Sequence, residues 1–143
     1  MTPQEAVSRL HTVLAHAWMI RTFLKHADEI QESDDMLEVP RTLYDSIRAV
    51  EPAFQRGDLA EFLRRLNGKL PKLRRVAEYF AAHFKDFSPH TNFEMASASL
   101  QGVVKQMEEI FAGLDWDAVR ALPVPPRPSS SANPVDDIEI PEV

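Results

Sequence analysis

Apolar residues recur every three or four positions through most of 1–120, the spacing that places them along one face of an α-helix. The first such segment starts at Pro3, where Thr2 and Glu5 match a helix-capping box, and it is expected to run for about 30 residues. Its apolar stripe consists of Ala6, Leu10, Val13, Ala17, Ile20, Leu24 and Ala27. The polar run at 33–35 then predicts a break before the second helix.

The second and third helices are predicted from the prolines and polar caps that bound them. The second begins at Pro40 and is expected to kink or end at Pro52, because a proline ring removes one backbone amide and clashes one turn back. The third begins after Asp58 and keeps its apolar residues in helical phase as far as Phe87. Pro71 lies inside this run, so we expect a helix that is kinked there, with a break near Pro71 as the alternative.

A fourth helix is predicted after a Ser-Pro turn, with Thr91 and Glu94 as its cap pair and Leu114 near its end. A further turn at 115–120 is expected to place Trp116 against the end of the bundle. No window alternates apolar and polar residues for long enough to predict a strand. The predicted fold class is therefore all-α, an antiparallel four-helix bundle.

Residues 1–121 are expected to form this bundle, whereas 122–143 differ in composition. Six of the eleven prolines lie in 122–143, together with the serines at 129–131, which predicts an extended Pro-rich acidic tail. Acidic and aliphatic side chains alternate near its end, at Asp136, Asp137, Ile138, Glu139 and Ile140. We expect this peptide to dock on a partner, as an added strand or in a groove lined with basic residues. The alternative is a disordered acidic terminus that aids solubility.

The charge balance and the absence of cysteine exclude several classes of function. The 143 residues include 16 basic and 22 acidic side chains, for a net charge of −6, and no cysteine. Disulfide scaffolds, thiolate metal sites and cysteine nucleophiles are therefore excluded. An acidic chain is not expected to bind nucleic acid generally, and the first residues match no secretory leader. We expect a soluble cytoplasmic protein of one domain, without a cofactor or a membrane contact.

One segment reverses the overall charge, because 62–77 carries six basic residues and no acidic one. Helical geometry places five of them within about 140° on the side away from the leucine stripe. This basic face consists of Arg64, Arg65, Lys69, Lys72 and Arg75. It is compatible with nucleic-acid phosphates, an acidic partner, the chain's own tail or simple solvation.

The middle of the first helix is apolar nearly all round. Trp18, Met19 and Phe23 lie off the stripe that contains Leu10 and Leu24. A helix that is apolar on every side is either central in its bundle or buried in a second interface. Self-association or a protein partner is therefore expected at these three residues, with cover by loops or by the tail as the alternative.

A weak metal-site pattern lies near the turn between the third and fourth helices. His83, Asp86, His90 and Glu94 converge there in sequence, and imidazole and carboxylate are ligands for zinc or iron. Capping and packing roles explain the same four residues, so no metal is expected.

Arg21 and His26 are separated by four residues, an Arg-x4-His spacing. This short motif resembles that of the HEPN family of helical-bundle domains, many of which are ribonucleases. The resemblance implies, as an enzyme alternative, a cleft formed by dimerisation in which Arg21 and His26 assist attack of a ribose hydroxyl on the adjoining phosphate. An exposed pair of His26 with Glu29, one turn further on, explains the histidine more simply.

The function expected from the sequence is non-enzymatic. It is that of a helical-bundle interaction or assembly subunit, which docks a partner through Ile138 and Ile140 with the neighbouring acids in support. The alternative is a HEPN-like, metal-independent ribonuclease or a nucleic-acid-binding bundle that uses Arg21, His26 and the basic face.

Overall fold

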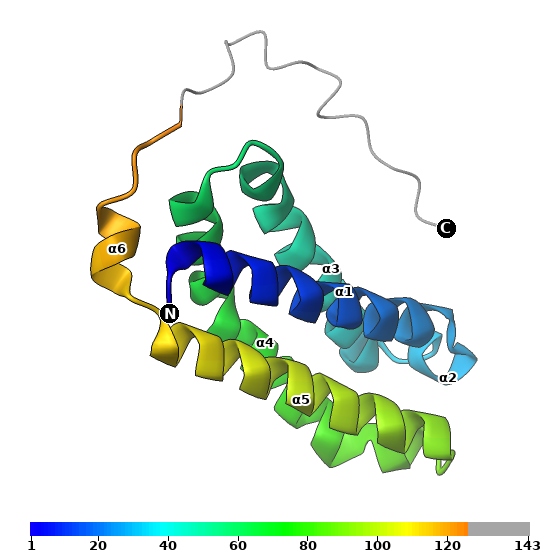
Figure 1. Cartoon of the computed structure of the whole chain (residues 1–143). Helices are drawn as coiled ribbons and strands as arrows, with labels where there is room; N and C mark the ends of the chain where they lie inside the picture. Colours follow the sequence, from blue (N-terminus) through cyan, green and yellow to red (C-terminus); the bar gives the residue numbers. More distant parts are fainter. Residues whose placement is uncertain (126–143) are drawn as a thin grey trace, which may run out of the picture.

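The computed structural model describes residues 1–125, and this range contains helices and no strand. The helices are α1 (Pro3–His26), α2 (Asp28–Gln31), α3 (Asp34–Gln55), α4 (Leu59–Phe87), α5 (Thr91–Gly113) and α6 (Trp116–Arg120). The four long helices, α1, α3, α4 and α5, pack antiparallel as a bundle (Figure 1). The predicted all-α four-helix bundle is therefore confirmed for this part of the chain.

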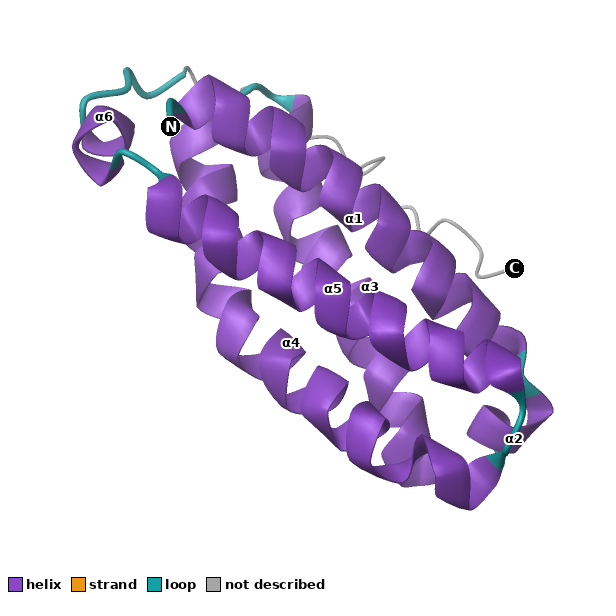
Figure 2. Ribbon diagram, turned by 60° about the horizontal axis from the view of Figure 1, so that its bottom comes forward, coloured by secondary structure: helices purple, strands orange, loops and turns teal. Residues whose placement is uncertain are grey.

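Neighbouring helices follow the ring order α1, α3, α4, α5 (Figure 2), the up-and-down arrangement that short connections favour. The short helices lie at the ends: α2 joins α1 to α3, and α6 lies beside the N-terminus at the opposite end. The largest fully buried side chains come from α2 and all four long helices: Phe62, Phe80, Leu10, Leu24, Ile30, Met36, Leu43, Leu63, Leu66, Leu73, Leu100 and Met107. No helix within 1–125 is long and apolar enough to cross a membrane.

Both ends of the described chain lie at the same end of the bundle. The Asp115 amide donates to the carbonyl oxygen of Met1 at 3.0 Å, so the start of α1 lies against the connection between α5 and α6 (Figure 1). Trp116 stacks on Phe111 with ring centroids 6.0 Å apart, which confirms the predicted packing of this tryptophan against the bundle end. The chain then leaves α6 and is described as far as Pro125.

The first helix is shorter than predicted. It ends at His26, and Ala27 is extended with φ −79° and ψ 124° before α2 begins. Two features favour this break. The side-chain amide of Gln31 donates to the carbonyl of Lys25 at 2.8 Å, and the acidic residues that open α2 are stabilised at a helix N-terminus rather than at a C-terminus. The break also allows Ile30 to be completely buried.

The second long helix begins earlier than predicted, at Asp34 instead of Pro40. The Ser33 hydroxyl accepts the Met36 amide at 3.2 Å, so the polar run that suggested a loop is the N-cap of α3. Of the two outcomes expected at Pro52, a kink or an end, the end does not occur, because α3 continues for three residues beyond it. Pro52 is exposed, so its ring meets solvent and not the packed core.

The third long helix is continuous through Pro71, because α4 runs without interruption from Leu59 to Phe87, so the alternative of a break there is wrong. The Asp58 carboxylate accepts the Glu61 amide at 3.1 Å, as the capping pattern predicts. The predicted cap of the next helix is wrong by one residue. Thr91 is the first residue of α5, and His90 is the N-cap, whose Nδ1 accepts the Asn92 amide at 3.0 Å.

Two glycines in or beside α4 give opposite predictions for stability. Gly68 is exposed inside α4, and a Cβ placed there meets no atom within 4 Å. Gly57 precedes α4 with φ +73°, a conformation that residues with a side chain rarely adopt. Gly68→Ala is expected to raise the free energy of unfolding by about 0.5–1 kcal/mol, and Gly57→Ala to lower it by about 1 kcal/mol. Urea unfolding followed by circular dichroism measures both, and shifts of the same sign would contradict the prediction.

Candidate functional site

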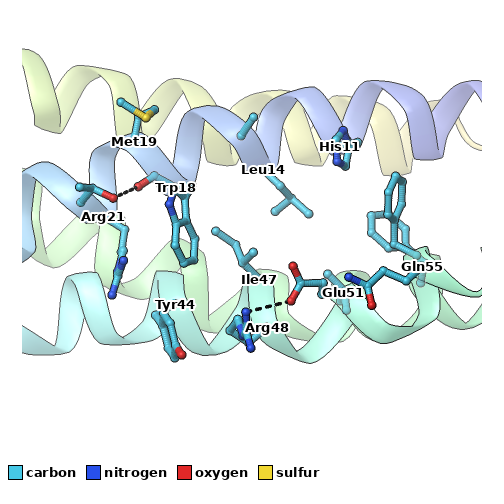
Figure 3. Close-up of a pocket in the computed structure, with 15 residues that line it drawn as sticks. His11, Leu14, Trp18, Met19, Arg21, Tyr44, Ile47, Arg48, Glu51 and Gln55 are labelled. Carbon is cyan, nitrogen blue, oxygen red and sulfur yellow. Dashed lines mark hydrogen bonds and ion pairs between the residues drawn. The ribbon is translucent and has the colours of Figure 1, made fainter. Parts of the chain in front are cut away.

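A groove open to solvent separates the middle of α1 from the C-terminal half of α3 (Figure 3). Its volume is about 810 Å³ and its lining is predominantly apolar. The lining residues come from α1 and α3, with Phe62 of α4 below them. A groove of this size accommodates a small ligand or several side chains of a protein partner.

Aromatic contacts hold α1 and α3 apart at each end of the groove. The rings of Trp18 and Tyr44 lie with their centroids 5.9 Å apart. Towards the other end, His11 stacks on Phe54 with a centroid distance of 4.4 Å and an interplanar angle of 9°. Two aliphatic side chains point into the gap between these contacts: Leu14 and Ile47 (Figure 3). The groove therefore exists because bulky rings meet at its ends and smaller side chains lie between them.

Arg21 is the buried charged residue of this site, with only 5% of its surface exposed. Its guanidinium carbon lies 4.6 Å from the ring centroid of Trp18 and 4.9 Å from that of Tyr44. A planar, delocalised cation is attracted to the negative face of an aromatic ring, and this attraction strengthens as water is excluded. Arg21 thus links the two helices at the Trp18–Tyr44 end (Figure 3).

The charged side chains at the rim are predominantly basic. Arg48 lies 5.9 Å from the Tyr44 ring centroid and forms an ion pair with Glu51, with 3.0 Å between Nη1 and Oε1. Lys25 follows Arg21 one turn later on α1. Two arginines and one carboxylate therefore line a groove with an apolar floor: Arg21, Arg48 and Glu51.

The three residues of the predicted apolar surface on the first helix lie in different surroundings. Trp18 lines the groove, whereas Met19 is 67% exposed at its rim. Met19 also borders a smaller hollow of about 400 Å³ between α1 and α5. Phe23 packs on Phe93 of α5, with ring centroids 5.5 Å apart. Trp18 and Met19 therefore belong to one candidate surface, and Phe23 belongs to the α1–α5 contact.

The α3 side of the groove is absent from the sequence predictions. Tyr44, Ile47 and Phe54 recur at spacings of three and seven residues, which places them in one stripe beside the buried face of α3. That stripe was the signal that could have identified them. Because the predicted helix was expected to kink or end at Pro52, Phe54 lay beyond that boundary, and Tyr44 and Ile47 alone do not distinguish a second face.

Arg21 and His26 are not brought together in the bundle. Arg21 lies in the groove, whereas His26 is exposed at the last residue of α1. Five residues correspond to about 140° around a helix, so the two side chains leave α1 in different directions.

The four residues of the weak metal pattern have other roles. The closest approach of His83 to Asp86 is 3.4 Å, within one helical turn of α4. His90 caps α5, and Glu94 lies exposed in the first turn of that helix. Among residues 1–125, no group of three histidine or carboxylate side chains is placed to hold a metal ion.

The basic face is partly neutralised by acids that lie just outside it. Arg64 and Arg65 both pair with Glu61, and the neighbouring Arg74 pairs with Glu108 of α5 at 2.7 Å. The remaining members form no ion pair with another residue of 1–125: Lys69, Lys72 and Arg75. The hydrogen bond from Arg65 lowers the pKa of Glu61 below its ordinary value.

This lowered pKa predicts a small acid-dependent loss of stability. A carboxylate with a depressed folded-state pKa stabilises the protein above its unfolded pKa of 4.5, and the contribution is lost as the pH falls through the folded pKa. Glu61→Gln is expected to lower the free energy of unfolding by less than about 1 kcal/mol at neutral pH, because the pair is partly solvated. Urea unfolding at pH 7 and near pH 3 should show this difference disappearing in acid, and a difference that grows in acid would contradict it.

The predicted docking peptide lies outside the described residues, and with it Asp136, Asp137, Ile138, Glu139 and Ile140. Comparison with known proteins gives no relative from which a role can be transferred. No family model, no curated protein and no solved structure matches the chain significantly.

Proposed function

We propose that the chain is a non-enzymatic protein-interaction subunit, a helical bundle that receives a protein segment in the groove between α1 and α3. The observation that carries this proposal is the groove itself, an apolar depression bordered by Trp18, Tyr44, Arg21 and Arg48. Tryptophan, tyrosine and arginine are the residues most enriched at the energetic centres of protein interfaces.

The chemistry of the groove defines the kind of segment that it would bind. Aliphatic side chains would bury apolar surface between Leu14 and Ile47, and carboxylates would lie near the guanidinium groups at the rim. The expected ligand is thus an acidic–aliphatic segment of a protein. The C-terminal peptide around Ile138 and Ile140 has the same chemistry, and it remains a predicted docking element.

The ribonuclease alternative has no structural observation in its favour. It requires Arg21 and His26 to act in a cleft formed by dimerisation, but Arg21 lies over the rings of Trp18 and Tyr44, and His26 is exposed and outside the groove lining. Nucleic-acid binding by the basic face would require phosphate contacts, and the pairing of Arg64 and Arg65 with Glu61 leaves Lys69, Lys72 and Arg75 to make them. Metal-independent RNA cleavage that is lost in His26→Ala would revive the enzyme alternative.

Site-specific photo-crosslinking in the native host tests the proposed interaction surface. A crosslinking amino acid at Met19, which is 67% exposed at the groove rim, is expected to trap a discrete protein partner. The same amino acid at Met95, 53% exposed on α5 and outside the groove, is the matched control. The Met19 adduct should disappear when Ile47→Lys places a charge in the groove. Identical adducts from both positions, or no adduct at Met19, would contradict the proposal.

A further inference from the structure

We infer that the C-terminal peptide of this chain, residues 135–140, docks intramolecularly in the groove between α1 and α3. This inference rests on the proposed function, because it names the segment that occupies the groove until a partner displaces it. The peptide is then an internal competitor for the interaction surface.

Charge and polarity are complementary between the groove and the peptide. The groove has an apolar floor and is lined by two arginines, Arg21 and Arg48, and by one carboxylate, Glu51, which pairs with Arg48. The peptide offers aliphatic side chains and a cluster of acids in a chain whose net charge is −6: Val135, Asp136, Asp137, Ile138, Glu139 and Ile140. Opposite charges around a buried apolar contact favour this pairing over an uncharged apolar ligand.

The spacing of the peptide matches the length of the groove. In an extended segment Ile138 and Ile140 would fall on one face, about 7 Å apart, with Asp137 and Glu139 on the other. From His11 to Trp18 the groove follows seven residues of α1, or about 10 Å. Two isoleucines therefore fit between the aromatic contacts that close its ends, with the carboxylates directed towards the rim.

The length of chain beyond α6 permits this contact within one molecule. The described chain ends at Pro125, five residues after α6 and at the same end of the bundle as the start of α1, and 18 residues follow it (Figure 1). The 13 residues from Pro125 to Ile138 reach at most about 45 Å when extended, whereas the groove begins about 12 Å along α1, eight residues after Pro3. A tethered segment of this length acts at an effective concentration of about 1 mM, which favours docking in the same molecule over docking in a second copy.

The basic face on α4 is the competing receptor for the acidic peptide. Its members Lys69, Lys72 and Arg75 form no ion pair within 1–125, so charge alone does not favour the groove over this face. The basic residues of that face, however, point away from the apolar stripe of α4. Carboxylates would gain screened surface contacts there, but Ile138 and Ile140 would gain no burial. The groove provides both contributions, charge contacts for the carboxylates and burial for the two isoleucines.

A labelled synthetic peptide of residues 134–143 provides the test. The buried hydrophobic residues that the structure describes within 1–125 lie between Ala6 and Val119, so a chain that ends at Pro125 retains them. Fluorescence anisotropy should show the peptide binding to this shortened bundle, and binding at least about tenfold weaker to the full chain, whose groove is occupied. Ile138→Ser with Ile140→Ser in the full chain should restore binding to the level of the shortened bundle.

A matched pair of arginines locates the binding site. Arg48→Glu, in the groove, should weaken binding to the shortened bundle by at least about tenfold. Arg41→Glu should leave it unchanged, because Arg41 lies on the same helix with an equivalent ion pair, 3.0 Å from Glu38, but outside the groove.

The inference is overturned if the peptide fails to bind the shortened bundle, if the full chain binds it equally well, or if both charge reversals act alike. Weaker binding to the full chain that depends on protein concentration assigns the contact to a second copy and also overturns it. Failure of the proposed function would give a different result: neither the full chain nor the Ile138→Ser, Ile140→Ser variant would form the Met19 photo-adduct. If the peptide covers the groove, the variant should form more of this adduct than the full chain.

Discussion

Replacing Arg21 with glutamate is expected to lower the free energy of unfolding by about 3 kcal/mol. Two terms contribute to this loss. The guanidinium group over the rings of Trp18 and Tyr44 is removed, and such contacts stabilise by up to about 2 kcal/mol where water is excluded. A carboxylate would then face the negative side of both rings at a position that is only 5% exposed, where it is poorly solvated.

Two further substitutions separate the sign of the charge from the packing of the side chain. Arg21→Met retains most of the volume without a charge, and it should lower stability by about half as much as Arg21→Glu. Arg9→Glu is the control on the same helix, because the Arg9 side chain is 61% exposed and its ion pair with Glu5 is long, with 4.0 Å between Nη2 and Oε2. This substitution should change the free energy of unfolding by less than about 0.5 kcal/mol. Urea unfolding measures all three, and equal effects of Arg21→Glu and Arg9→Glu would contradict the stacked arrangement.

Phe80→Ala is expected to have the largest effect on the bundle, a loss of about 3–5 kcal/mol in the free energy of unfolding. Phe80 is completely buried in α4, and its ring centroid lies 5.9 Å from that of Phe84. The substitution removes the transfer free energy of a phenyl ring and leaves a cavity that rigid neighbouring helices fill only in part.

The control for this truncation is an apolar side chain that the bundle does not enclose. Met95→Ala on α5 removes a side chain that is 53% exposed, so it should change stability by less than about 0.5 kcal/mol. Thermal unfolding followed by circular dichroism compares the two. A Phe80→Ala shift no larger than that of Met95→Ala would show that the core is packed differently.

The fold was predictable where the signals are local. Thr2 and Asp58 cap their helices as the sequence predicts, because a capping pattern involves residues only three positions apart. The start of α3 was not predictable in the same way, since the polar run that contains Ser33 is compatible with either a loop or a cap. The complete burial of Met36 and Val39 against the other helices favours the cap, and that contact is tertiary.

The candidate site was predictable on one helix and not on the other. Trp18 and Met19 stand out because α1 has apolar residues outside its core stripe. The role of Arg21 depends on Tyr44, which reaches it from α3, and no spacing within α1 contains that information. The Arg-x4-His spacing therefore suggested a catalytic pair, although in the structure Arg21 lies over the rings of Trp18 and Tyr44.

Paramagnetic relaxation tests most directly whether the groove receives the C-terminal peptide in the intact chain. The chain has no cysteine, so a single one introduced at Glu142 carries a nitroxide label without interference from other thiols. Docking predicts selective broadening of the Trp18 indole and Ile47 methyl signals, with the Met95 methyl unaffected. The broadening should persist when protein that carries both the nitroxide and the isotope label is diluted with an excess of protein that carries neither, because the contact is within one molecule. Broadening that concentrates on the basic face of α4, or that leaves Trp18 and Ile47 unchanged, would contradict docking in the groove.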